Sequence, residues 1–280
     1  MMMLTTVEMA QRLEEADVLH LTRQVEACSQ LFPGQDISAL SVGGGVAGFT
    51  LPSFGRKLNH IVGFGVGGTV SSEELVAIEK SYSNKGIDTE IDLCPHADAS
   101  TLPVLSTHGY TVNGFINNYV RILTDNDLVG AGSLEASRIK ISRVNSERLG
   151  EFPDISLAGY SDGGRPELLL KTLARIAASR ADTRIYFATI DGKIAGSAGL
   201  ALIETSKGGV AHLYIDSTLP EYRGRGVQVA LLRARLSDAR RAGFGIASSG
   251  ARPANVSSRN IERAGFCLAY TKVTFAKKCE

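Results

Sequence analysis

The stretch PEYRGRGVQVALLRARL, residues 220–236, restricts the possible folds of this chain more than any other. The preceding run VAHLYIDST, residues 210–218, alternates as a strand does, and from Val227 onward apolar residues recur at helical spacing. Two glycines and the arginines beside them interrupt both patterns. The sequence therefore predicts a strand that feeds a helix N-terminus through a glycine-arginine loop.

Such a loop favours an anion. A helix N-terminus leaves backbone N–H groups unpaired at the positive end of the helix dipole, and glycines let that backbone approach a phosphate closely. Between Glu221 and Arg263 there are nine arginines and three acids, whereas the whole chain has 30 Lys and Arg against 29 Asp and Glu. A phosphate-bearing ligand explains this concentration of charge; a solvated turn with arginines on an exposed helix face is the alternative.

Composition limits the other classes of partner. The near-neutral charge argues against an extended nucleic-acid or membrane surface, and no stretch approaches the roughly 18 apolar residues of a membrane span. The start of the chain turns acidic too early for a signal peptide, and four scattered cysteines suit a reducing compartment, so we expect a cytoplasmic protein. Five histidines without ligand spacing predict no metal site.

The organisation of the chain suggests an internal duplication. Turn-forming residues in TDNDLVGAGSLEASR, 124–138, read as a linker, which predicts domains at 1–125 and 139–280 joined by 126–138. Each half has an early helix, strands, a glycine-bearing loop before a helix, another strand, and similar endings, LSTHGYTV and IERAGFCL. We infer two copies of one α/β unit.

The second half resembles a known family. The segment YRGRGVQ at the strand-to-helix turn and SRNIERAGF after the next strand are similar to the GNAT superfamily of acyl-CoA-dependent N-acyltransferases. Arg223 and Gly226 match its Gln/Arg-x-x-Gly-x-Gly/Ala signature, while Gln228 stands where the family has Gly or Ala. The resemblance covers 139–280, with 1–125 a divergent, mainly structural copy. It implies an α/β (α+β) fold of two tandem domains, each a mixed, mostly antiparallel sheet flanked by helices.

The resemblance also implies a coenzyme site. The pyrophosphate of acetyl-CoA would lie on the backbone from Arg223 to Gln228, and the pantetheine arm would run beside the strand from His212 to Thr218. The residues expected to bind the coenzyme are Ser217, Thr218, Arg223, Gly224, Arg225, Gly226, Val227, Gln228, Asn255 and Asn260.

Acyl transfer to an amine needs a base, an oxyanion site and an acid. Strand alternation places His212, Tyr214 and Asp216 on one face, so His212 or Asp216 is the candidate base and a nearby backbone N–H the oxyanion donor; a packed core histidine is the alternative. Ile261 stands where many relatives have a tyrosine acid, which leaves Tyr214 or Tyr270. Cys267, in an apolar strand, is not expected to react.

Two other functions remain open from the sequence. Gly63-x-Gly65-x-x-Gly68, with Asp88 beyond it, has the form of a dinucleotide fingerprint and would suit an NAD(P)-dependent oxidoreductase. A CoA-binding module without activity is the third possibility. The leading hypothesis is direct transfer of an acetyl group, in a ternary complex, to a primary amine of a small molecule or peptide. The acceptor, the acyl chain length and the oligomeric state are not readable from the sequence.

Overall fold

All strands of the protein join one sheet. The computed structural model describes residues 5–129, 138–160 and 163–279. In those residues the sheet has 11 strands in the order β1-β2-β3-β4-β11-β5-β10-β9-β8-β7-β6. The strands are β1 (Ser38–Val42), β2 (Gly45–Phe49), β3 (Ile61–Val62), β4 (Thr89–Leu93), β5 (Thr111–Ile122), β6 (Ile139–Arg143), β7 (Thr183–Ile190), β8 (Lys193–Ile203), β9 (Val210–Thr218), β10 (Ile246–Ala251) and β11 (Cys267–Lys277).

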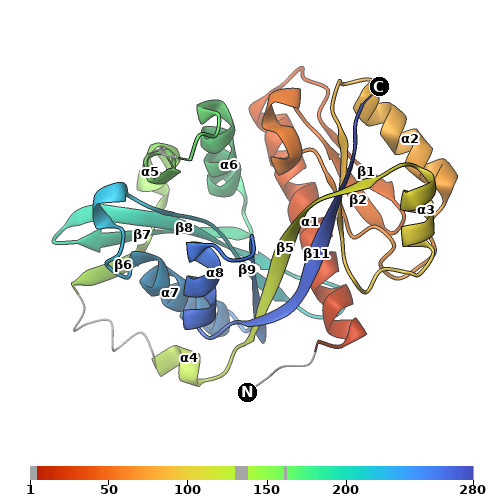
Figure 1. Ribbon diagram of the computed structural model, residues 1–280. Coiled ribbons are helices and arrows are strands. Elements are labelled where there is room, and N and C mark those ends of the chain that lie inside the picture. The colour runs from red at the N-terminus through yellow and green to blue at the C-terminus, as the bar shows by residue number, and fades with distance from the viewer. Residues whose placement is uncertain (1–4, 130–137, 161–162, 280) are drawn as a thin grey trace.

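Helices cover both halves of this sheet (Figure 1). The α-helices are α1 (Val7–Leu31), α2 (Ser72–Ser83), α3 (Thr101–Thr107), α4 (Asn126–Val129), α5 (Phe152–Tyr160), α6 (Glu167–Ser179), α7 (Val227–Arg241) and α8 (Val256–Arg263), with short 3-10 helices η1 (Pro52–Lys57), η3 (Ser146–Glu151) and η4 (Pro220–Tyr222). None of the helices in the described residues is long and apolar enough to cross a membrane.

The last strand of each half lies in the sheet of the other half. β5 ends the first half, yet its residues 117–122 pair antiparallel with β10 of the second half. β11 ends the second half, yet its residues 273–277 pair antiparallel with β4 of the first half. β5 and β11 also pair with each other, and in Figure 1 they run side by side between the two halves. The predicted boundary between the halves is therefore crossed by two exchanged strands.

The two halves repeat the same order of elements, which agrees with the inferred duplication. In each half one pair of neighbouring strands is parallel, β3 with β4 and β9 with β10, whereas the other strand pairs in the described residues are antiparallel. A helix, α2 or α7, connects the two parallel strands in each half. The predicted mixed, mostly antiparallel architecture is confirmed, with the two sheets merged into one.

Helix α1 connects the halves. Its buried residues Ala10 and Leu13 pack against Ala201 and Val210 of β8 and β9, while Leu21 and Val25 pack against strands of the first half. Arg12 donates hydrogen bonds to the carbonyl oxygens of Gly208 and Gly209, at 3.1 and 2.6 Å. Burial of apolar side chains is the main stabilising term in such an interface, so the first helix holds the second half in place.

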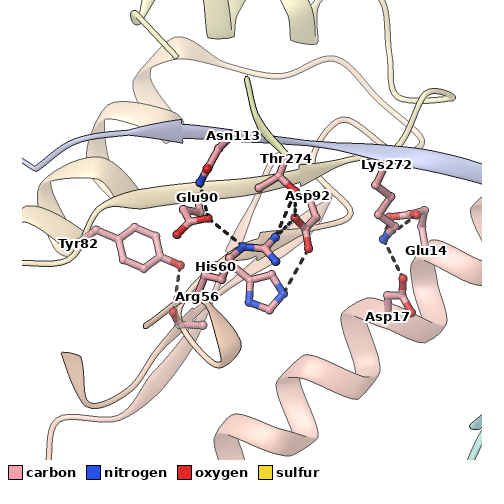
Figure 2. A network of polar contacts seen from close by, with 11 residues as sticks. Glu14, Asp17, Arg56, His60, Tyr82, Glu90, Asp92, Asn113, Lys272 and Thr274 are labelled. Atoms are coloured by element: carbon pink, nitrogen blue, oxygen red, sulfur yellow. Dashed lines mark hydrogen bonds and ion pairs between the residues drawn. The ribbon is translucent and has the colours of Figure 1, made fainter. Parts of the chain in front are cut away.

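A buried polar network joins α1 and β11 (Figure 2). Lys272 of β11 lies 2.8 Å from Glu14 and 2.7 Å from Asp17 of α1. Burial alone would lower the pKa of Lys272, but the two carboxylates outweigh it and raise that pKa. Beside this trio, Arg56 pairs with Glu90 and Asp92 of β4. The exchanged strand β11 is thus held to the first half by paired charges as well as by its backbone.

Several local signals in the sequence correspond to what the structure shows. Asp191 and Gly192 form the turn between β7 and β8, both with positive φ (50° and 77°), as a two-residue hairpin turn of this handedness requires. Ser71 caps α2 by accepting hydrogen bonds from the N–H groups of Glu73 and Glu74. Of the predicted linker 126–138, residues 126–129 form α4 and residues 130–137 lie outside the described part of the chain.

Candidate active site

Two parallel strands separate at the cavity that forms the candidate site. β9 and β10 pair from Val210–Ile246 to His212–Ser248 and not beyond. The space between the separating ends is a cavity of about 330 Å³. The residues that line it are Gln24, Lys57, Tyr160, Arg165, Leu170, Leu173, His212, Leu213, Tyr214, Ile215, Asp216, Gln228, Leu232, Ser249, Gly250, Ser257 and Ile261.

The predicted glycine-arginine loop lies at one end of α7. Gly224 and Gly226 have φ of 73° and 85°, a left-handed conformation that favours glycine, and Gly226 precedes the first helical residue, Val227. No side chain caps this N-terminus, so its first N–H groups face outward. Arg223 donates to the carbonyl oxygen of Gly159 at 3.0 Å, and the Arg225 guanidinium lies 5.4 Å from the Tyr222 ring centre. The loop is an anion-binding geometry of backbone N–H groups with an arginine beside it.

Polar side chains join α7 to α8 beside this loop. Gln228 donates to Ser257 Oγ at 3.0 Å and accepts from Asn260 at 2.8 Å. Asn255 caps α8, because its side-chain oxygen accepts from the N–H of Ser258 at 2.7 Å. Gln228 lines the cavity, whereas the side-chain oxygen of Asn255 is already used as a helix cap.

A bulge in β9 changes the direction of the side chains that follow it. Ile215 has φ of 53°, and the pairing with β8 shifts between Ser197–Ser217 and Gly199–Tyr214. After the bulge, Asp216 points to α7, where it forms a buried ion pair with Arg235. The expectation that Asp216 shares a face with His212 and Tyr214 is wrong, because the extra residue reverses the alternation.

The side chain of Asp216 is engaged by a buried arginine, which does not suit a catalytic base. Arg235 is fully buried and also donates to the carbonyl oxygens of Leu231 and Gly199, at 3.0 and 2.8 Å. Burial raises the pKa of Asp216 while the charge of Arg235 acts in the opposite sense. Ser217, on the opposite face, shares a 2.9 Å hydrogen bond with Ser197, and Thr218 accepts from Arg223 through its carbonyl oxygen.

Three rings from the two halves meet beside the cavity: His212 and Tyr214 line it, and His20 of α1 lies against both. His212 lies 4.7 Å from His20 of α1, ring centre to ring centre, and His20 lies 4.6 Å from Tyr214. His212 Nδ1 is hydrogen-bonded to Ser248 Oγ at 2.9 Å, and Arg180 contacts His20 Nδ1 at 3.2 Å. Burial lowers the pKa of both histidines, so both rings are neutral near pH 7. A neutral imidazole is able to accept a proton.

The remaining predicted acid, Tyr270, lies elsewhere. Its hydroxyl donates to Glu14 at 2.6 Å and accepts from Asn118 at 3.0 Å, inside the network between α1 and β11. Tyr270 does not line the cavity between β9 and β10. Tyr214 does, and its hydroxyl is within 3.0 Å of Thr183 Oγ1. Burial raises the pKa of Tyr214, which keeps the hydroxyl protonated.

Comparison with known proteins identifies this half of the chain. Residues 149–266 match the acetyltransferase (GNAT) family model. These residues are therefore similar to a GNAT acetyltransferase domain. No curated protein sequence matches the chain. Among solved structures, a GCN5-related N-acetyltransferase from Kribbella flavida is 16% identical, with 96% of this chain and 95% of that chain covered and a TM-score of 0.65.

Two further solved structures share the fold along nearly the whole chain. A tandem GNAT protein from the clavulanic acid biosynthesis pathway is 13% identical, covers 96% of this chain and 94% of its own, and has a TM-score of 0.59. A GCN5-related N-acetyltransferase from Sphaerobacter thermophilus is 14% identical, with 95% and 94% covered and a TM-score of 0.55. The likeness therefore extends to the tandem arrangement of two GNAT-like halves.

In the first GNAT-like half, the space between the parallel strands is closed. Phe64 follows β3 and is fully buried against Leu75 of α2 and Leu105 of α3. The carbonyl oxygen of Gly65 accepts from the N–H of Asp98 at 2.7 Å, which ties the glycine loop to the segment after β4. A side chain thus fills the position that in the GNAT domain is a cavity.

The surroundings of the glycine loop, residues 63–68, do not suit a dinucleotide. Gly63 and Gly67 border a groove that Glu14 and Glu15 of α1 also line, and carboxylates beside a pyrophosphate are unfavourable. The sheet order is also not that of a parallel, doubly wound fold. The glycines of 63–68 serve a GNAT-like turn instead.

Sequence reasoning did not find the residues that the first half adds to the GNAT cavity. Gln24 of α1 and Lys57 of η1 line the cavity, and His20 of α1 lies against the ring of His212. They lie more than 150 positions from His212 in the chain. No local pattern marks them, because only the packing of the two halves brings them to the cavity. In the described residues no group of three or more His, Cys, Asp or Glu is placed to hold a metal ion.

Proposed function

We propose that the protein transfers an acetyl group from acetyl-CoA to a primary amine of a small molecule or peptide. The observation that carries this proposal is the cavity of the GNAT domain, which lies between the separated ends of β9 and β10 beside the N-terminus of α7. One wall comes from Gln228 and Leu232 of α7 and Ile261 of α8, and the floor comes from β9.

The coenzyme phosphates would be held by backbone N–H groups of Arg223 to Gln228, with the positive end of the α7 dipole behind them. Beyond His212 the β9 backbone is no longer paired with β10, although the carbonyl oxygens of Leu213 and Asp216 accept hydrogen bonds from Ser249 Oγ and the Tyr160 hydroxyl. The pantetheine arm would run along this end of β9 as an added strand would. The bulge at Ile215 takes backbone groups out of the ladder with β8 at the cavity surface. One such N–H would polarise the thioester carbonyl.

His212 is the proposed base. The neutral ring would accept a proton from the ammonium group of the acceptor, and the freed amine would attack the thioester carbon. The carbon–sulfur bond then breaks, the leaving thiolate takes a proton from Tyr214, and the second proton lost by the attacking nitrogen passes to the tyrosinate. His20, in contact with both rings, would hold their orientation. We do not assign the base to Asp216, since Arg235 holds its carboxylate on the other face of the strand.

Calorimetric titration with acetyl-CoA, and with NADH and NADPH in parallel, tests the proposal first. Binding of acetyl-CoA alone, followed by release of free thiol in the presence of an amine panel, is the expected result. Binding of a nicotinamide cofactor in place of acetyl-CoA would overturn it.

A CoA-binding module without catalysis is the second candidate, because Ile261 stands at the cavity where many relatives have a tyrosine acid. Binding of acetyl-CoA without release of free coenzyme A thiol in the presence of any tested amine would favour this second function. Replacing Ile261 with Tyr then offers a direct check, since a restored acid would start turnover.

A further inference from the structure

Two cations face the cavity and have no anionic partner. Lys57 of η1 and Arg165, just before α6, both line it. Neither makes a hydrogen bond or an ion pair with any residue in the described part of the chain. Hydrogen bonds from Arg or Lys to a carboxylate or phosphate are among the strong ones in proteins. Two unpaired cations in one cavity therefore offer a binding site for an external anion.

The charges around Lys57 strengthen this point. Desolvation by the surrounding residues lowers the pKa of Lys57 to about 8, with Arg165, Arg56 and Arg252 adding repulsion. The residue is nevertheless exposed to solvent. Asp92 offers a weaker attraction and is already paired with Arg56. An arriving anion would relieve the repulsion among these cations.

The carboxylate that lines this cavity does not serve as the anionic partner of Lys57 and Arg165. Asp216 is the acidic residue among the lining side chains, and it is paired with the fully buried Arg235. His212 and Tyr214, by contrast, line the cavity with uncharged rings, and His20 lies against both. The cavity therefore has a cationic part supplied by Lys57 and Arg165 and an uncharged part beside His212.

We propose that the acceptor carries an anionic group, a carboxylate or a phosphate ester, which Lys57 and Arg165 bind while its amine lies at His212. The proposal rests on the acyl-transfer function above. It assigns the cations to the acceptor and not to the coenzyme, because they come from η1 and from the α5–α6 connection. The coenzyme phosphates belong to the loop before α7, on a different element. In this arrangement both halves select the acceptor, the first through Lys57 and the second through Arg165.

Product-like probes test this without knowledge of the acceptor. With saturating coenzyme A, the protein is titrated by calorimetry with N-acetylated ω-amino acids from N-acetylglycine to N-acetyl-6-aminohexanoate, and with the neutral amide of each. O-Phosphoryl-N-acetylethanolamine against N-acetylethanolamine covers the phosphate ester. A hydrogen bond to a charged group contributes about 1.5–3 kcal/mol, so the best anionic probe should bind at least about tenfold more tightly than its neutral counterpart.

Substitutions test whether the two cations cause the preference for the anionic probe. Lys57→Met and Arg165→Met should each reduce the ratio of neutral-probe Kd to anionic-probe Kd several-fold and leave the Kd of coenzyme A unchanged. Lys193→Met, at the exposed turn between β7 and β8, is the matched control and should keep it.

Three results would overturn parts of this picture in distinguishable ways. Coenzyme binding with no anionic probe preferred over its neutral counterpart removes the acceptor proposal alone. Loss of coenzyme affinity in Lys57→Met, with probe binding unchanged, assigns the cations to the coenzyme and also removes it. Failure of the parent protein to bind coenzyme A removes the acyl-transfer function itself.

Discussion

Arg235 of α7 holds the carboxylate of Asp216 directly after the bulge of β9, and the arginine side chain is fully buried. The pair fixes the conformation of the bulge, because Arg235 also contacts the carbonyl oxygens of Tyr214 in β9 and its partner Gly199 in β8, directly before the bulge. Removing one member of a buried ion pair leaves the other charge uncompensated.

Arg235→Met should therefore lower the free energy of unfolding by about 3–5 kcal/mol. Chemical denaturation followed by circular dichroism measures the change. Arg233→Met, an exposed position on the same helix, is the control and should change stability by less than about 0.5 kcal/mol. Equal stability of the two variants would show that the buried pair does not hold the bulge.

Gly226→Asp should abolish binding of acetyl-CoA. The substitution puts a carboxylate at the N-terminus of α7, where phosphate oxygens are expected, and the φ of 85° adds strain to any side chain there. Gly226→Asn is the matched control, because asparagine has nearly the same size, tolerates this conformation and has no charge. Calorimetry should find a much greater loss for Asp than for Asn. Comparable binding by Gly226→Asp and the parent would place the coenzyme elsewhere.

His212→Gln should lower kcat by about 10²–10⁴ with a small effect on coenzyme binding, as expected for the loss of a general base. Because burial lowers the pKa of His212, the parent rate should rise with pH through a value below 6.5 and stay level above it. The rate is lost at lower pH because the ring is then protonated. A pH profile of kcat/KM checks this, and an unchanged acid limb in His212→Gln would assign that titration to another group.

Stability should fall in mild acid because of His60. Burial lowers its pKa to about 4, against about 6.5 in the unfolded chain. Between these values the unfolded chain binds a proton that the folded protein does not, so the free energy of unfolding decreases as the pH drops from 6.5 to 4. The full effect is on the order of 3 kcal/mol. His20 and His212 act in the same sense, so the comparison that isolates His60 is parent against His60→Asn, whose slope should be shallower.

Fragments should show how far the halves depend on each other. Residues 139–280 without β5 lose the partner of both β10 and β11, so this fragment is expected to remain largely unfolded by itself. Residues 1–125 lose β11, which pairs with both β4 and β5. Mixing the two fragments should restore a folded protein, visible as dispersed amide signals in NMR spectra. Dispersed signals from 139–280 alone would mean that this half is an independent domain.

Local features of the fold were predictable from the sequence, and features set by packing were not. The glycine-arginine loop, helix α7 and the Asp191-Gly192 turn each follow from a few adjacent residues. The bulge at Ile215 has no such signal: an isoleucine with positive φ contradicts local preference and is held by its surroundings. Strict alternation therefore placed Asp216 on the wrong face.

The candidate site shows the same division. Gln228 lies in the loop that the family resemblance indicates, whereas Gln24 and Lys57 reach the cavity from the other half of the chain. The exchange of β5 and β11 was equally hidden, because a strand's own pattern does not name its partner. Which strands pair over long distances in the chain depends on how the complete sheet packs, and the residues of one strand do not specify it.

The position of β11 has a consequence for the way the protein is made. A chain folds from its N-terminus during synthesis, one unit after another. Here β4 gains its second partner only when residues 267–277 have been made, long after its own residues 89–93. Until then β4 presents an open edge, the kind of surface that pairs with other chains. β11 is therefore the strand whose synthesis closes the sheets of both halves at once.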